Sequence, residues 1–128
     1  MISGDTIVAA ATPLGFSGVA VIRVSGPKSF SLAEKVTRKK KTKNRRASLA
    51  TIYNKENKKI DSAIVTLFAS PASYTGEDTL EISSHGNPAL VDAIISTLCF
   101  FGARLAEPGE FTYRAFLNGK IDLIQAEA

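Results

Sequence analysis

Strand-like and helix-like segments follow one another irregularly along this chain, without the repeated strand–helix–strand order that builds a parallel sheet. Short runs rich in β-branched residues and bounded by turn residues predict five strands. We expect these strands over residues 6–11, 18–24, 48–53, 60–68 and 79–84. The third and fourth flank a short polar loop, which is typical of a hairpin. The mixed order favours an α+β fold, in which helices pack on a mixed β-sheet.

Helix signals are most complete after the last of these strands. Asn87 can cap a helix and Pro88 suits its first turn. Apolar residues then recur at helical spacing as far as Gly102. A brief helix is also expected over residues 27–36, and a second short one over residues 111–117.

The stretch PGEFTYRAFLNGKIDLIQAEA, residues 108–128, joins two helical pieces through a tight turn at Asn118, Gly119 and Lys120. The turn holds the Lys120 cation at a fixed place at the end of one helix. Asp122 and a glutamine three residues later have the spacing of a capping box, which predicts that a further helix begins there.

The length and composition of the chain bound its domain organisation. A chain of 128 residues, 45% of them hydrophobic, can bury one core. Its last helical segment carries no stop signal, so we expect a fragment of a longer protein. The expected division is one domain over residues 1–119 and the start of a truncated helical domain over residues 120–128.

Positive charge is concentrated in one segment. The formal net charge is +4, yet residues 38–46 alone contain seven basic residues, which leaves nine basic against twelve acidic residues elsewhere. This pattern does not indicate a surface that binds nucleic acid throughout. The basic segment is either one phosphate-binding patch or a solvated loop that lies outside the packed sheet.

The numbers of cysteine and histidine residues and the length of the apolar runs exclude several classes of protein. A single cysteine excludes an internal disulfide framework, and with a single histidine it leaves too few ligands for an all-protein zinc site. No apolar run approaches the roughly 20 residues of a membrane helix. We therefore expect a cytoplasmic protein from a reducing compartment, with no membrane partner.

Two charged residues on strands are candidate ligand-binding groups. Arg23 lies near the end of its strand, where its guanidinium either pairs with an acid inside the domain or faces an anionic ligand. Glu81 shares the polar face of a strand with Thr79 and Ser83. A carboxylate there can accept two parallel N–H donors from a ligand. The residues alone favour a solvated or ion-paired glutamate over a ligand-binding one.

Other candidates have structural alternatives. Lys120 either binds a ligand or only complements the dipole of the helix that it follows. Gly15 and Gly18 form either a tight turn or the backbone wall of a pocket. His85 has the chemistry of a proton carrier but no evident Ser or Cys partner, and Cys99 lies on an apolar helix face. We assign no catalytic residue and no metal ligand.

Three motifs carry a resemblance to a known family. They are SGVAVIRVSG at residues 17–26, YTGEDTLEISSHGNP at residues 74–88, and the C-terminal stretch. With them, nearly the whole chain resembles the N-terminal domain of the tRNA-modifying GTPases called MnmE or TrmE. The resemblance implies a fold similar to the folate-binding domain of glycine-cleavage aminomethyltransferase, a homodimer, and a folate pocket near the dimer interface. It carries the ligand residues over to Arg23, Glu81 and Lys120.

The function implied by the resemblance belongs to a larger assembly. Such proteins work with a flavin-dependent partner, MnmG, to modify C5 of the wobble uridine in certain tRNAs, and their N-terminal domain binds 5-formyltetrahydrofolate or another one-carbon tetrahydrofolate. GTP, potassium and magnesium would belong to a GTPase domain that is absent here, since the sequence has no G-x-x-x-x-G-K-[ST] loop. One departure is Ser84-His85-Gly86-Asn87, where the family more often has Cys-His-Gly-Gly. Because Asn tolerates positive φ, we expect the turn to survive.

Overall fold

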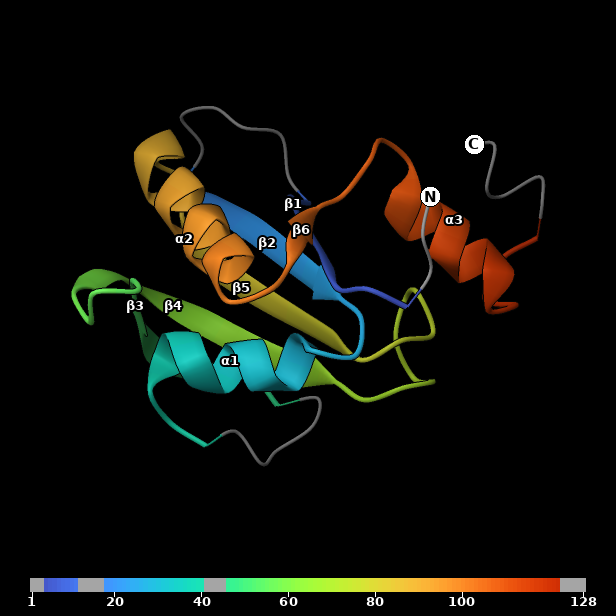
Figure 1. The fold of residues 1–128 in the computed structure, drawn as a ribbon, viewed down its shortest axis with the longest axis horizontal. Coiled ribbons are helices and arrows are strands. Elements are labelled where there is room, and N and C mark those ends of the chain that lie inside the picture. The colour runs from blue at the N-terminus through green and yellow to red at the C-terminus, as the bar shows by residue number, and fades with distance from the viewer. Residues whose placement is uncertain (1–3, 12–17, 41–45, 123–128) are drawn as a thin grey trace.

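The structure, a computed structural model, describes residues 4–11, 18–40 and 46–122. Within these ranges the chain forms a mixed sheet of six strands and three helices, in the order β1–β2–α1–β3–β4–β5–α2–β6–α3 (Figure 1). The strands are Ile7–Ala10, Val19–Ser25, Ser48–Tyr53, Lys59–Phe68, Thr79–His85 and Arg104–Leu105, and the helices are Ser29–Thr37, Pro88–Phe100 and Glu110–Leu117. The expected α+β fold with a mixed sheet is confirmed.

The sheet has the strand order β3-β4-β5-β2-β1-β6. Neighbouring strands are antiparallel except β1 and β6, which pair in parallel. The expected hairpin is β3–β4, and α1 and α2 lie on the same face of the sheet, whereas α3 lies beyond its end (Figure 1). The opposite face of the sheet therefore presents the polar side of β5.

The hydrophobic core lies between the sheet and the two helices that cover it. Alternate residues of the central strands point into it, as the two-residue period of a strand requires. Fully buried examples are Ile22 on β2 and Ile82 on β5, which belong to the same core cluster as Leu32 of α1 and Ile94 and Leu98 of α2. The residues that alternate with these core residues along each strand point to the opposite face of the sheet.

Some local details differ from the expectations. The short strand β6 was not predicted, because two residues carry no periodicity. Asn87 has φ −69°, so the turn before α2 does not use the positive φ that we invoked for it. Its side chain instead accepts a hydrogen bond of 2.8 Å from the backbone N–H of Ala89, which is the cap that the sequence predicted.

Several expectations fall outside the described ranges, namely the helix beginning near Asp122, the turn at Gly15 and most of the basic segment. The ends of that segment, Arg38 to Lys40 and Arg46, are exposed between α1 and β3. Among the described residues, the structure contains no helix of the length and hydropathy needed to span a membrane.

Candidate ligand pocket

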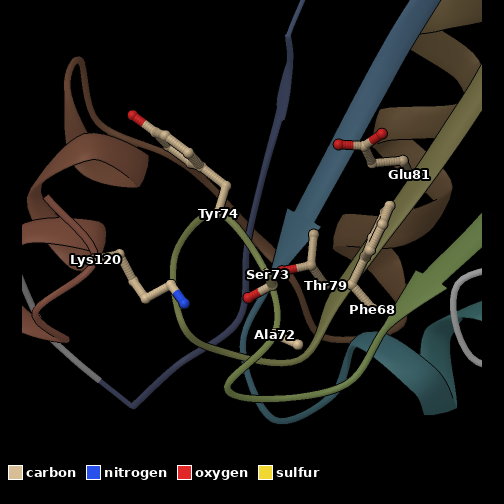
Figure 2. A pocket seen from close by; sticks show the side chains of 7 residues that line it. All are labelled: Phe68, Ala72, Ser73, Tyr74, Thr79, Glu81 and Lys120. Carbon is tan, nitrogen blue, oxygen red and sulfur yellow. The ribbon is translucent and has the colours of Figure 1, made fainter.

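A cavity of about 450 Å³ lies where β4 ends and β5 begins, within the size range of small-molecule sites. Its walls come from three places: the two strand ends, the loop that joins them, and the turn after α3 (Figure 2). The lining side chains are Phe68, Ala72, Ser73, Tyr74, Thr79, Glu81 and Lys120. Two aromatic rings, a carboxylate and an ammonium group therefore share one cavity.

Glu81 and Arg23 form an ion pair beside this cavity. The two residues are direct neighbours in the register of β2 and β5. The Arg23 Nε and Nη2 atoms lie 3.0 and 2.9 Å from Oε2 of Glu81, and both side chains are 28% exposed. Of the two alternatives for Arg23, pairing with an acid inside the domain is the one observed. Its guanidinium also lies 5.6 Å from the centre of the Tyr74 ring, so it orients two lining residues.

Lys120 follows the tight turn that ends α3. Gly119 adopts φ 72°, and the backbone N–H of Lys120 donates to the carbonyl of Ala115 at 2.9 Å, so the predicted turn is confirmed. In Figure 2 the Lys120 side chain extends from this turn towards the loop that carries Ser73, on the other side of the cavity from Glu81. The backbone thus ends the helix while the side chain lines the cavity.

His85 and Cys99 do not line this cavity, and their side chains make contacts within the fold. The His85 ring Nδ1 and its backbone N–H both lie 2.9 Å from the Asp61 carboxylate. Burial raises the pKa of Asp61, but hydrogen bonds from His85 and from Ser62 outweigh it and leave the pKa lowered. Cys99 packs against the core, and burial raises the pKa of its thiol.

A cluster of five charged residues beneath α3 was missed by the sequence analysis. Its members are Asp5, Glu77, Arg104, Glu110 and Arg114. The side chains of Glu110 and Arg114 are 0% and 2% exposed, which is rare for charged residues unless they are paired. Glu110 and Arg114 are four residues apart on α3, a spacing typical of helix ion pairs, but the helix was expected only from residue 111, so this signal was not used.

The acids of this cluster should make stability depend on pH. Hydrogen bonds from Arg104 lower the pKa of Asp5 and of Glu110 below their ordinary values of 3.8 and 4.5, against the opposing effect of burial. A depressed pKa contributes stability above the unfolded-state value, and this contribution is lost as pH falls through the folded-state value. We expect the thermal midpoint to be level down to about pH 5 and to fall below it.

Circular dichroism melts between pH 7 and pH 3 would measure this dependence. Glu110→Gln, which cannot titrate, should begin less stable and show a shallower decline in acid. A wild-type midpoint that stays constant well below the ordinary carboxyl pKa values would contradict the expectation.

Comparison with known proteins places these features in a family. The family described as "GTP-binding protein TrmE N-terminus" matches residues 6–120. A protein named tRNA modification GTPase MnmE from Francisella philomiragia is 54% identical over 128 residues. Proteins of the same name from Francisella tularensis subsp. novicida and subsp. tularensis are each 52% identical. Each alignment covers 100% of this chain and 28% of the relative, so the chain spans less than a third of their length. The family match extends from the residue before β1 to the lysine in the cavity wall, and the chain belongs to the TrmE N-terminal family.

Proposed function

We propose that this chain is the folate-binding and dimerisation domain of a tRNA modification GTPase. Its ligand is 5-formyltetrahydrofolate or another one-carbon tetrahydrofolate, bound in the cavity between Glu81 and Lys120. The observation that carries the proposal is the shared lining of that cavity, in which a carboxylate, an ammonium group and two aromatic rings surround one space. A folate offers a group for each of them.

Glu81 suits the polar edge of a pterin. Arg23 contacts Oε2 of Glu81, and among the described residues no hydrogen bond to Oε1 is present. A carboxylate held in this way keeps acceptor capacity for the N–H groups of an amino-pyrimidinone ring. Arg23 acts in this arrangement as the group that orients Glu81, in addition to the contact with ligand that the family resemblance implies for it.

The remaining lining residues fit the rest of a folate. Phe68 and Tyr74 present aromatic surface, which favours stacking with a flat ring. Lys120 supplies a cation for an oxygen of the one-carbon group or for the carboxylates of the glutamate tail. When bound, such a folate would supply a one-carbon unit, while these residues would bind and orient it.

The wider assembly is proposed from the names of the relatives and from the family resemblance. They are named tRNA modification GTPases, and most of their length lies outside this chain. In the proposed assembly the domain forms a homodimer, has a fold similar to the folate-binding domain of glycine-cleavage aminomethyltransferase, and works in the cytoplasm. A flavoprotein of the MnmG type is its partner in modifying C5 of the tRNA wobble uridine. GTP, potassium and magnesium are bound by the remainder of the protein.

Calorimetric titration of this chain with 5-formyltetrahydrofolate tests the proposal. We expect saturable binding with one ligand per chain, and parallel titrations with unsubstituted and 5-methyl tetrahydrofolate would rank the one-carbon states. Folded protein that shows no binding would contradict the proposal. Binding of RNA instead, with a steep dependence on salt, would support the alternative in which residues 38–46 contact phosphates.

A further inference from the structure

We propose that Arg114 is a positioning residue for the ligand cavity, because it locks the loop of residues 72–77 to α3. The inference rests on the proposed ligand pocket and adds to it residues that touch no ligand. The cavity has one wall on that loop, with Ser73 and Tyr74, and another on the turn after α3, with Lys120 (Figure 2). Its shape therefore depends on how the loop and the turn are held together.

Arg114 joins α3 to both the loop and the N-terminal segment. Its Nη1 donates to the backbone carbonyl of Asp5 at 2.6 Å and to Oε1 of Glu77 at 3.1 Å. Its Nη2 donates to Oδ1 of Asp5 at 2.6 Å and lies 3.4 Å from Oε2 of Glu110. A planar fork with fixed donor directions can satisfy these acceptors together, whereas an ammonium group cannot.

Glu77 connects Arg114 to the rest of the loop through further hydrogen bonds. Its Oε1 accepts a hydrogen bond of 2.7 Å from Ser25 Oγ, which lies 2.7 Å from Thr75 Oγ1. The Ser73 hydroxyl donates to the backbone carbonyl of Glu77 at 2.5 Å. Thr75 and Ser25 are fully buried, so the loop is fixed from its base rather than from solvent.

A second contact closes the loop directly on the turn that carries Lys120. The Asn118 Nδ2 donates to the carbonyl of Thr75 at 2.9 Å and to that of Arg114 at 3.0 Å. Gly76 packs so closely that an added Cβ would lie 2.8 Å from Cβ of Asn118 and 3.4 Å from Cγ of Lys120. Together, Arg114 and Asn118 set the distance between the two cavity walls. Binding groups must be held within about 0.5 Å of their productive positions, so a loosened cavity wall should weaken ligand binding.

Arg114→Lys tests the inference, since it keeps the charge and removes the fork. We expect the Kd for 5-formyltetrahydrofolate to rise roughly tenfold or more with unchanged stoichiometry. In the absence of ligand, backbone amide hydrogen exchange should accelerate over residues 73–77 and 118–120, while α2 and the central strands keep their protection. An exposed arginine, changed as Arg46→Lys, is the matched control and should alter neither measurement.

Two further variants separate positioning from general stability. Leu98→Ala removes buried volume under α2, away from the cavity, so it should destabilise the fold and leave the Kd unchanged. Glu77→Gln weakens the loop end of the lock while keeping Arg114, and it should reproduce the effect of Arg114→Lys. It also serves as the test if the latter does not fold.

Each outcome decides the inference. Unchanged affinity and unchanged loop exchange in Arg114→Lys and Glu77→Gln would overturn it, as would faster exchange spread evenly over the whole sheet. If the wild-type chain binds no folate, the proposed function fails, and the exchange measurement still shows whether Arg114 locks the loop.

Discussion

Glu81→Ala should weaken binding of 5-formyltetrahydrofolate about a hundredfold or more, and so abolish it in an ordinary calorimetric titration. A hydrogen bond to a charged group contributes about 1.5–3 kcal/mol, and every 1.4 kcal/mol changes Kd about tenfold. Two such bonds from the pterin edge to the carboxylate account for the expected loss. The variant also removes the ion-pair partner of Arg23 on β5, so the Arg23 guanidinium is no longer held in place by Glu81.

Three matched variants sharpen this experiment. Glu81→Gln keeps one acceptor and the side-chain shape, so we expect a loss between those of wild type and alanine. Arg23→Ala should also weaken binding, since it frees the carboxylate to turn. Glu56→Ala removes an exposed acid from the β3–β4 hairpin and should have no effect. Wild-type affinity in folded Glu81→Ala would contradict the assignment of Glu81 to the ligand.

The elements with a local pattern could be predicted from the sequence. The β-branched runs gave five strands, and α2 was marked by Asn87, Pro88 and its apolar spacing. The turn at Gly119 was equally visible, since few other residues adopt its positive φ. The strand β6 was not, because its parallel pairing with β1 depends on a contact between Arg104 and Ile7 that is distant in sequence.

The candidate site was also predictable only where it depends on local sequence patterns. Glu81 was placed on the polar face of its strand, and the residues alone left Arg23 between an internal acid and a ligand. Which acid it meets depends on the register of β2 and β5, a long-range property. Glu81 and Lys120 line one cavity in the structure, but that both bind folate came from the family resemblance and stays a prediction.

The charged cluster was missed because its chemistry is decided by burial. In the sequence, Arg114 and Glu77 have the ordinary appearance of surface charges. Only when α3 closes over the N-terminal segment and the loop does Arg114 become 2% exposed and paired. The members of the cluster come from three distant parts of the chain, so no local sequence pattern could have predicted that they meet.

Glu110→Ala should destabilise the fold by about 3–5 kcal/mol, the cost typical of removing one partner from a buried ion pair. The Glu110 side chain is 0% exposed and accepts from Arg104 Nη1 and from the backbone N–H of Glu107, each at 2.9 Å. Its removal takes one carboxylate away from Arg104 and Arg114, which both pair with it, so the two positive charges are less compensated. The thermal midpoint should fall by roughly 10 °C or more, measured by calorimetry or circular dichroism at neutral pH.

Asp92→Ala provides the control, since it removes an exposed acid from α2 and should change the midpoint little. Loss of stability in Glu110→Ala should be accompanied by weaker ligand binding in the protein that remains folded, because α3 carries Lys120 at its end. A midpoint equal to that of Asp92→Ala would contradict the view that the cluster holds α3 in place. The support for the Lys120 side of the cavity would then have to come from the contacts of Arg114 with Asp5 and Glu77 and from the loop contact of Asn118.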